Sequence, residues 1–317
     1  MYTAGVPLMS CVIETQSLSK SYGGFRALDQ VDLRIKPGTI GLLGPNGAGK
    51  STLIKCLLQL HDKDGGKASL LGQDIDLHGR ETRKRIGYAP EQDCHIPGML
   101  GCEYVTYCAQ LSGMPFSVAR QRAHEMLDFV GMEQERYRKV DTYSTGMKQR
   151  VKIAQALVHD PELVFLDEPT NGLDPKGQAL VLDLIEKIWK ESGISVVLSS
   201  HLLHDVERVC EQVVIISKGR ILVQDTLESL KAKRKPEAEI VTSEEASVLE
   251  ALFDREGWTS EVLSNGNVKV LHGQATLNPL IRILAREGIS PLEIKECPNA
   301  LNELFIQALG NGEKGAA

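Results

Sequence analysis

Nine consecutive residues carry the clearest chemistry in the sequence. They are Gly44, Pro45, Asn46, Gly47, Ala48, Gly49, Lys50, Ser51 and Thr52, which follow the pattern G-x-x-x-x-G-K-S-T. Glycines let backbone N–H groups approach phosphate oxygens, and the first turn of a helix adds a favourable dipole. We expect all nine residues to contact a nucleotide, with Lys50 reaching its β and γ phosphates and Ser51 ligating a bridging Mg²⁺.

The flanking segments have the pattern that such a phosphate-binding loop needs. An apolar strand is expected at 39–43, and Leu53, Ile54, Leu57 and Leu58 recur at helical spacing. The glycines therefore lie at a strand-to-helix turn, which is the context that makes the motif specific. A glycine-rich turn without a ligand is the alternative, and it does not account for the lysine and hydroxyl that follow.

Two carboxylates follow a second apolar strand at 163–166. They are Asp167 and Glu168, and because side chains alternate along a strand, the two cannot point the same way. We expect Asp167 to hold Mg²⁺ and its water shell, and Glu168 to act as the general base that polarises an attacking water. Acids at a strand end are otherwise often only solvated, and the phosphate-binding loop upstream favours the catalytic interpretation.

Composition restricts the class of protein. The 317 residues are 42% hydrophobic and 25% charged, as in an ordinary globular protein, and the net charge of −6 argues against a nucleic-acid surface. The sequence predicts neither a bilayer-spanning segment nor a secretory signal, so we expect a cytosolic location. The seven cysteines are an odd number and form no C-x-x-C motif, which indicates reduced thiols rather than disulfides. His201 and His204 lack a third ligand at zinc spacing.

Strands that alternate with helices after residue 160 predict a parallel sheet covered on both faces. Before the phosphate-binding loop the pattern is β-rich, and after it a helical insertion shows two apolar stripes. One stripe is Tyr104, Val105, Tyr107, Cys108 and Leu111, and the other is Ala123, Met126, Leu127 and Val130. The expected fold of this part is α/β.

A short basic run ending at Pro236 predicts a domain boundary. A basic run can bind anionic partners, but a solvated linker is the preferred interpretation. The order of elements after it, βαββαβ with an added helix, predicts a small ferredoxin-like α+β domain for regulation or dimerisation. The expected parts are a nucleotide-binding domain at 11–230 with a helical subdomain at about 93–143, a linker at 231–237, the small domain at 238–310 and a flexible tail at 311–317.

Residues 12–230 resemble the ATP-binding subunit of ABC transporters. Besides the phosphate-binding loop and the strand ending in Asp167 and Glu168, four further motifs carry the resemblance. They are the signature motif at 143–150 (YSTGMKQR), the D-loop at 172–175 (GLDP), the switch histidine His201 and the Q-loop glutamine Gln92. Tyr22 is similar to the aromatic residue that stacks on adenine.

The resemblance implies a P-loop ATPase fold, with an antiparallel β segment and a helical subdomain, that binds ATP and Mg²⁺. It implies catalytic roles for Lys50, Gln92, Glu168 and His201, and metal contacts from Ser51, Gln92 and Asp167. It also implies that Ser144 and Gly146 contact the nucleotide of a second copy, in a homodimer or a dimer with a related ATPase subunit. From the residues alone, Ser144 could simply cap a helix, His201 be satisfied locally and Tyr22 belong to the core.

The signature departs from the common LSGGQ form at Tyr143, Thr145 and Met147. Thr145 adds a Cβ where glycine allows close approach to phosphate, so turnover could be slower. The resemblance further implies a separate membrane permease as partner, reached through Gln92 and the helical segment after it, and a peripheral position on the inner face of the cell membrane. Met99 and Phe116 could offer the permease apolar contacts, and core packing is the preferred interpretation of each. Its variant of the motif is similar to that of exporters of drugs, antibiotics, lipids or sodium.

Two other classes of function remain as alternatives. The first is a soluble ABC-type ATPase that acts on nucleic acid or ribosomes, which the acidic balance and the single ATPase half disfavour. The second is a GTPase or a small-molecule kinase, which shares the phosphate-binding loop but explains neither the signature motif nor His201.

Overall fold

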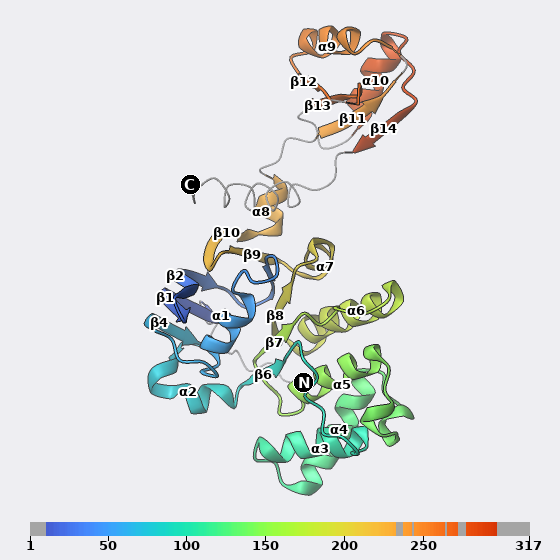
Figure 1. Cartoon of the computed structure of the whole chain (residues 1–317). Coiled ribbons are helices and arrows are strands. Elements are labelled where there is room, and N and C mark those ends of the chain that lie inside the picture. Colours follow the sequence, from blue (N-terminus) through green and yellow to red (C-terminus); the bar gives the residue numbers. More distant parts are fainter. Residues whose placement is uncertain (1–10, 233–236, 243, 264, 272–276, 297–317) are drawn as a thin grey trace. The chain divides into compact units, whose positions relative to one another are not determined.

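The computed structural model describes residues 11–232, 237–242, 244–263, 265–271 and 277–296. These residues form two compact units, the first ending at Leu227 and the second beginning at Glu228 (Figure 1). The first two residues of the expected linker belong to helix α8 (Leu227–Ala232). Most of the remaining linker, the expected tail at 311–317 and the expected additional helix after residue 297 lie outside the described residues.

The first unit is organised around a six-stranded sheet. Its strand order is β10-β9-β3-β8-β7-β6, and all neighbours are parallel except β10 and β9. Every residue of β3, β7 and β8 is buried, as expected of central strands covered on both faces, so the predicted parallel sheet is confirmed. The strands are β3 (Thr39–Leu43), β6 (Ile86–Ala89), β7 (Leu163–Asp167), β8 (Ser195–Ser200), β9 (Gln212–Ser217) and β10 (Arg220–Thr226).

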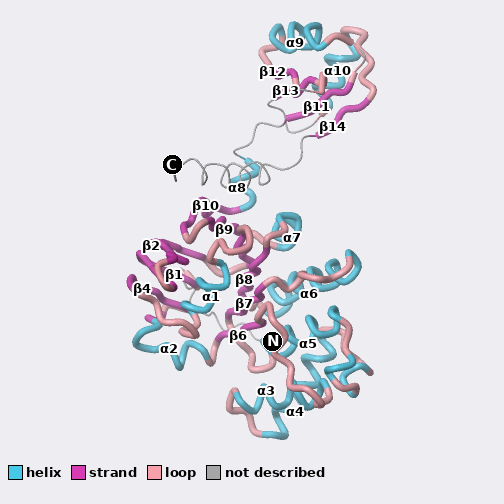
Figure 2. Tube along the Cα trace, in the orientation of Figure 1, coloured by secondary structure: helices cyan, strands magenta, loops and turns pink. Residues whose placement is uncertain are grey.

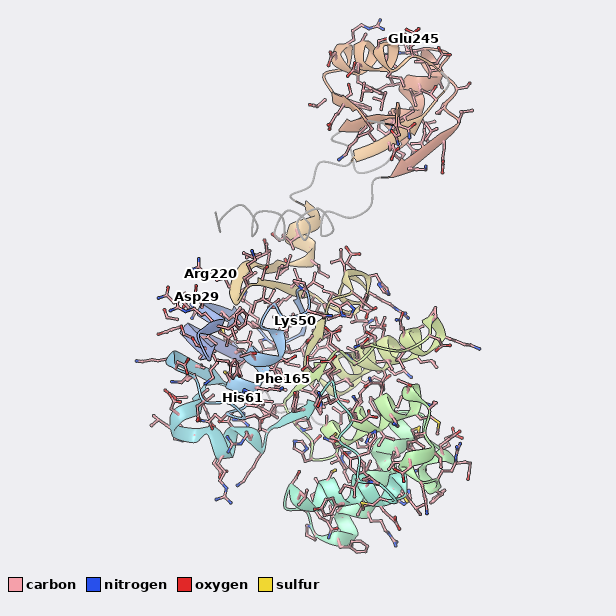
Figure 3. The ribbon with its side chains drawn as sticks, in the orientation of Figure 1. Asp29, Lys50, His61, Phe165, Arg220 and Glu245 are labelled. Carbon is pink, nitrogen blue, oxygen red and sulfur yellow. The ribbon has the colours of Figure 1, made fainter. Side chains whose placement is uncertain are left out.

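A second, antiparallel sheet of this unit has the order β2-β1-β4-β5. Helix α1 (Lys50–Leu57) and both sheets contribute to one apolar core, which joins Leu18, Leu53 and Phe165. Arg220 Nε lies 2.6 Å from Asp29 Oδ2 and ties β10 to β2, as Figure 3 shows. The strands are β1 (Ile13–Tyr22), β2 (Phe25–Ile35), β4 (Gly65–Leu70) and β5 (Gln73–Asp74).

Helices α3 and α4, which lie within the helical subdomain expected at about 93–143, gather with α5 on one side of the first unit (Figure 1). Val105 and Ala109 mark the centre of the buried face of α3, and Tyr107 and Leu111 lie on the opposite side, where they are exposed. The predicted apolar stripe is therefore wrong at these two residues. The helices of the unit are α2 (Ile75–Arg83), α3 (Gly101–Leu111), α4 (Phe116–Phe129), α5 (Thr145–Leu157), α6 (Pro175–Ser192) and α7 (Leu203–Val209), with short 3₁₀ turns at Glu135–Tyr137 and Val140–Thr142.

The second unit has the predicted βαββαβ order. Its antiparallel sheet has the order β12-β13-β11-β14, and the two helices α9 and α10 pack their apolar residues, among them Leu249, Phe253 and Leu284, into the core of the unit (Figure 2). The elements are β11 (Glu237–Val241), α9 (Ala246–Arg255), β12 (Thr259–Val262), β13 (Val268–Leu271), α10 (Asn278–Arg286) and β14 (Glu293–Glu296).

Within the described residues, no helix of either unit is both long enough and apolar enough to cross a bilayer.

Candidate functional site

The phosphate-binding loop joins the buried strand β3 to α1, which begins at Lys50. Gly47 and Gly49 have φ values of 78° and 111°, a region that favours glycine. Gly44 is fixed by packing, because a Cβ there would lie 2.3 Å from the carbonyl oxygen of Ile216. At Gly49 a Cβ would lie 2.7 Å from the carbonyl oxygen of Ala27. The glycines thus meet both a conformational and a steric requirement.

The loop lines a hollow of about 340 Å³. Of the residues expected to bind nucleotide, Tyr22 and all of Pro45–Thr52 line it, and so does Glu168, the residue after β7. Four further residues that the sequence analysis did not select also line it. They are Phe25, Ala27, Glu91 and Asn171.

Lys50 is buried beneath this hollow, near the centre of the first unit in Figure 3. Its Nζ donates to the carbonyl oxygens of Gly44 (2.6 Å) and Pro45 (3.3 Å) and lies 3.2 Å from Glu168 Oε1. A buried ammonium needs such partners, because its desolvation would otherwise be costly. The negatively charged oxygens of a phosphate group in the hollow would form stronger, charge-assisted hydrogen bonds with Lys50 in place of these contacts.

Glu168 is 5% exposed and has a φ of 49°, which a non-glycine residue rarely adopts and which is typical of functional sites. Its Oε2 lies 2.8 Å from His201 Nδ1, and the ion pair with Lys50 is the one polar contact of its Oε1 among the described residues. Asp167 points elsewhere, since its Oδ1 accepts a hydrogen bond of 2.7 Å from Ser199 Oγ. Lys50, Glu168 and His201 therefore form one cluster at the base of the hollow.

Asp205 links the two chain segments that carry Glu168 and His201, and the sequence analysis did not select it. It is fully buried, its Oδ2 accepts from Thr170 Oγ1 (2.5 Å), and its Oδ1 lies 2.9 Å from His204 Nε2. Thr170 follows Glu168 by two residues, and Asp205 lies on α7, just after His201. The pair consequently joins the two segments that carry Glu168 and His201. An acid beside apolar Val206 was the only sequence signal.

Tyr22 and Phe25 place two aromatic rings at the mouth of the hollow. The Tyr22 hydroxyl bonds to His61 Nδ1, and Lys20 Nζ lies 5.3 Å from the centroid of the Tyr22 ring. Burial raises the pKa of the Tyr22 hydroxyl. Phe25 has no such polar tie and is 63% exposed. An apolar ring so exposed beside a phosphate-binding loop suits a planar base.

Ser144 and Gly146 line a different hollow, of about 390 Å³, together with Gly172 and Asp174. Ser144 Oγ accepts from Met147 N (3.3 Å) at the start of α5, so it caps this helix, as Asp174 caps α6 by accepting from Gly177 N (3.0 Å). The signature motif and the phosphate-binding loop thus lie in separate hollows of one chain.

Gln92 is exposed in the segment after β6, and it does not line the hollow of the phosphate-binding loop. Its neighbour Glu91 does, and Glu91 Oε1 accepts from Asn171 Nδ2 (3.4 Å). Among the described residues, no group of three or more His, Cys, Asp or Glu side chains could hold a metal ion. Oxygen donors are nevertheless present at Ser51 and Glu168, which suits an ion that takes most of its ligands from phosphates and water, as Mg²⁺ does.

Comparison with known proteins yields consistent matches. The family described as "ABC transporter" matches residues 28–171. The chain is 33% identical over 311 residues to the bacitracin transport ATP-binding protein BcrA of Bacillus licheniformis, covering 97% of this chain and 100% of that protein. It is 38% identical over 221 residues to the daunorubicin/doxorubicin resistance ATP-binding protein DrrA of Streptomyces peucetius, covering 69% and 67% of the two chains.

Solved structures agree with these matches. The first unit is similar to cbiO1 from Clostridium perfringens, part of the ABC transporter complex cbiONQ, with a TM-score of 0.65, 27% identity and coverage of 71% of this chain and 92% of that one. It is also similar to the dimeric ATP-binding cassette MJ0796 bound to ADP and Pi, with a TM-score of 0.62, 27% identity and coverage of 68% and 98%.

Proposed function

The chain belongs to the ATP-binding subunits of ABC transporters, and from this premise we propose which of its residues bind ATP, hydrolyse it and transmit the result to a permease. It is an ATP hydrolase with an ABC-type P-loop fold. The alternative of a soluble ATPase acting on nucleic acid finds no support among these relatives. The observation that carries the proposal is the cluster of Lys50, Glu168 and His201 at the base of the phosphate-binding hollow.

Glu168 is the general base of hydrolysis. His201 holds Oε2 of the carboxylate, and Oε1 accepts the proton of a water molecule once Lys50 has moved from it to the phosphates. That water forms a bond to the γ-phosphorus while the bond between this phosphorus and the β–γ bridging oxygen breaks, giving ADP and inorganic phosphate. Lys50, drawn from Glu168 to the β and γ oxygens, stabilises their negative charge.

Mg²⁺ fits Ser51, the oxygen donor at the first turn of α1 that lines the hollow. Asp167, whose Oδ1 accepts from Ser199, would hold the water shell of the ion through Oδ2, and Gln92, which lies outside the hollow, would join when a second copy closes the site. When bound, the ion supplies further neutralisation of phosphate charge. Tyr22 and Phe25 would hold the adenine by stacking at the mouth of the hollow.

Two copies of the chain complete each site. Ser144 and Gly146 lie in a hollow of their own, so they reach a phosphate-binding loop only from a second molecule. The N-terminus of α5 would place its free N–H groups and dipole against the γ-phosphate. A dimeric relative bound to ADP and Pi supports this arrangement.

The permease would dock on the helical subdomain. Apolar side chains that are exposed on α3, α4 and the segment before them offer it a surface. These are Ile96, Tyr107, Leu111, Phe116 and Val118. Met99, which the sequence analysis selected with Phe116, is only half-buried. We place the subunit at the inner face of the membrane through this contact, and the relatives named for bacitracin transport and daunorubicin/doxorubicin resistance favour export of a drug or antibiotic.

The second unit would regulate the ATPase or help it dimerise. All the residues assigned here to ATP binding and hydrolysis lie in the first unit, which supports a role outside catalysis. A chain ending at residue 232 should therefore retain ATP hydrolysis and lose part of its dimerisation or its response to the permease.

The test of the proposed function is a comparison of the purified protein with its Glu168→Gln variant. The native chain should hydrolyse ATP with magnesium. The variant should bind ATP with similar affinity, because Lys50 and the loop are intact, and lose hydrolysis by at least about 100-fold. Hydrolysis at the native rate would remove Glu168 from the role of general base.

A further inference from the structure

Lys152, in the middle of α5, is a lysine with 1% of its surface exposed. Lysines are almost never fully buried unless they are paired. Its Nζ donates to two backbone oxygens, those of Pro90 and Glu91, each at 2.9 Å. Burial lowers the pKa of Lys152, which records the cost of placing an ammonium there. The side chain spans from the signature helix to the residues just before Gln92.

Two other residues of α5 hold the same segment. Lys148 Nζ lies 2.8 Å from Asp93 Oδ2, and Gln155 Nε2 donates to the carbonyl oxygen of Tyr88 (3.3 Å). Positions 148, 152 and 155 share one face of a helix. Gln155 Oε1 also accepts from Cys94 Sγ (3.3 Å). The segment 88–94 is therefore bonded to α5 through residues 148, 152 and 155.

Close backbone packing also joins β6 to the C-terminal part of α5. A Cβ at Gly87 would lie 2.1 Å from the carbonyl oxygen of Ala156, so β6 and α5 approach each other as closely as glycine permits. Gln155 is itself held by the hydroxyl of Tyr104 (2.6 Å). The segment and α5 are consequently one packed body within the first unit, from which the side chain of Glu91 already lines the hollow and the exposed side chain of Gln92 does not.

The three polar contacts differ in strength. Lys148 and Asp93 are partly exposed, and such ion pairs contribute little because water competes for both charges. Lys152 itself is 1% exposed, so its two bonds to carbonyl oxygens are shielded from water more than the ion pair of Lys148. It is the contact on which the common movement of α5 and the segment depends most.

We propose that Lys152 is a positioning residue that couples the two ATP sites of the dimer. This rests on the proposed function, in which Ser144 caps α5 and contacts the nucleotide held by the second copy, while Gln92 serves the nucleotide held by its own copy. When that second nucleotide draws in the N-terminus of α5, Lys152 carries Pro90 and Glu91 with the helix and brings Gln92 into the first site. Each bound ATP thereby prepares the other site.

The test is a Lys152→Met variant, which keeps the length of the side chain and removes its donors. Lys187→Met, at an exposed position of α6, is the matched control. Rates of ATP hydrolysis over a range of ATP concentrations give kcat, KM and the Hill coefficient. Misplacement of a catalytic group by ~1 Å costs on the order of 100-fold in rate, so we expect kcat to fall by at least about tenfold.

A purely structural role would lower the thermal stability and leave the cooperativity of hydrolysis unchanged. We expect instead a Hill coefficient above one in the native chain and close to one in Lys152→Met, with ATP binding within about twofold of native because the phosphate-binding loop is untouched. Hydrogen exchange of the peptide 88–95, measured in the Glu168→Gln background, should respond to ATP in the native sequence and not in Lys152→Met. Lys187→Met should behave as native.

A native Hill coefficient and kcat in Lys152→Met would overturn the inference, as would a Hill coefficient of one in the native chain. If Lys152→Met does not fold, Lys152→Gln decides, since its shorter amide keeps a donor but does not reach both carbonyl oxygens. It should lower the Hill coefficient, and an unchanged coefficient overturns the inference. A native chain that does not hydrolyse ATP would instead contradict the proposed function.

Discussion

Replacement of Lys50 by methionine should destabilise the nucleotide-free protein through Glu168. Loss of one partner of a buried ion pair costs about 3–5 kcal/mol, because the other charge stays desolvated. Here His201 Nδ1 still holds Oε2 of Glu168 at 2.8 Å, so we expect a cost just below this range, about 2–3 kcal/mol. For a domain of this size, 1 kcal/mol shifts Tm by ~2–4 °C, which gives a decrease of roughly 5–10 °C.

A double-mutant cycle separates this effect from a general loss of packing. Glu168→Gln removes the carboxylate charge, so adding Lys50→Met to it should cost little. Thermal or urea unfolding of the four proteins without nucleotide should give a coupling energy of about 1–3 kcal/mol. Additive effects of the two substitutions would refute the contact between Lys50 Nζ and Glu168 Oε1.

Three further predictions concern the surroundings of the site. Phe25→Ala should weaken ATP binding as much as Tyr22→Ala, each by about 1–3 kcal/mol, because both rings are expected to stack on the base. Equilibrium dialysis with ATP measures the two affinities. An unchanged affinity in Phe25→Ala would exclude its ring from the site. Asp205→Ala should lower kcat more than it raises KM, because Thr170 loses its buried hydrogen-bond partner and the segment that carries the general base shifts. A change in KM alone would argue against this role of Asp205. Burial lowers the pKa of His95 in the folded chain below 6.5, so the unfolded chain takes up the proton first and the free energy of unfolding should fall as the pH drops below ~6.5. Urea unfolding at several pH values should show a smaller fall of this free energy for His95→Phe than for the native chain. Identical pH profiles of the two proteins would contradict this.

Much of the fold was predictable, because the deciding signals are local. Glycines at positive φ, a buried apolar strand and an amphipathic helix specify the phosphate-binding loop within about 20 residues of sequence. The caps formed by Ser144 and Asp174 follow from their own side chains and the next turn of helix.

Residues whose role depends on tertiary packing were not predictable in this way. Lys152 and Asp205 are charged, and nothing in their neighbouring residues indicates that they are buried against backbone or side chains distant in sequence. Phe25 was missed because an exposed aromatic residue in a hairpin has no periodic signal. Tyr107 and Leu111 were assigned to a buried stripe because helical spacing does not reveal which side of α3 packs against its neighbours.

The central claim is that ATP bound at Lys50 of one chain is sealed by Ser144 of a second. Sedimentation of the Glu168→Gln variant with ATP and magnesium tests it most directly, because trapped nucleotide should hold the two copies together. The account predicts a species of about twice the 34.8 kDa monomer mass with two ATP per dimer, and a monomer when Ser144→Arg is added. A monomer that binds ATP in the Glu168→Gln variant itself, or a dimer indifferent to Ser144→Arg, would contradict it.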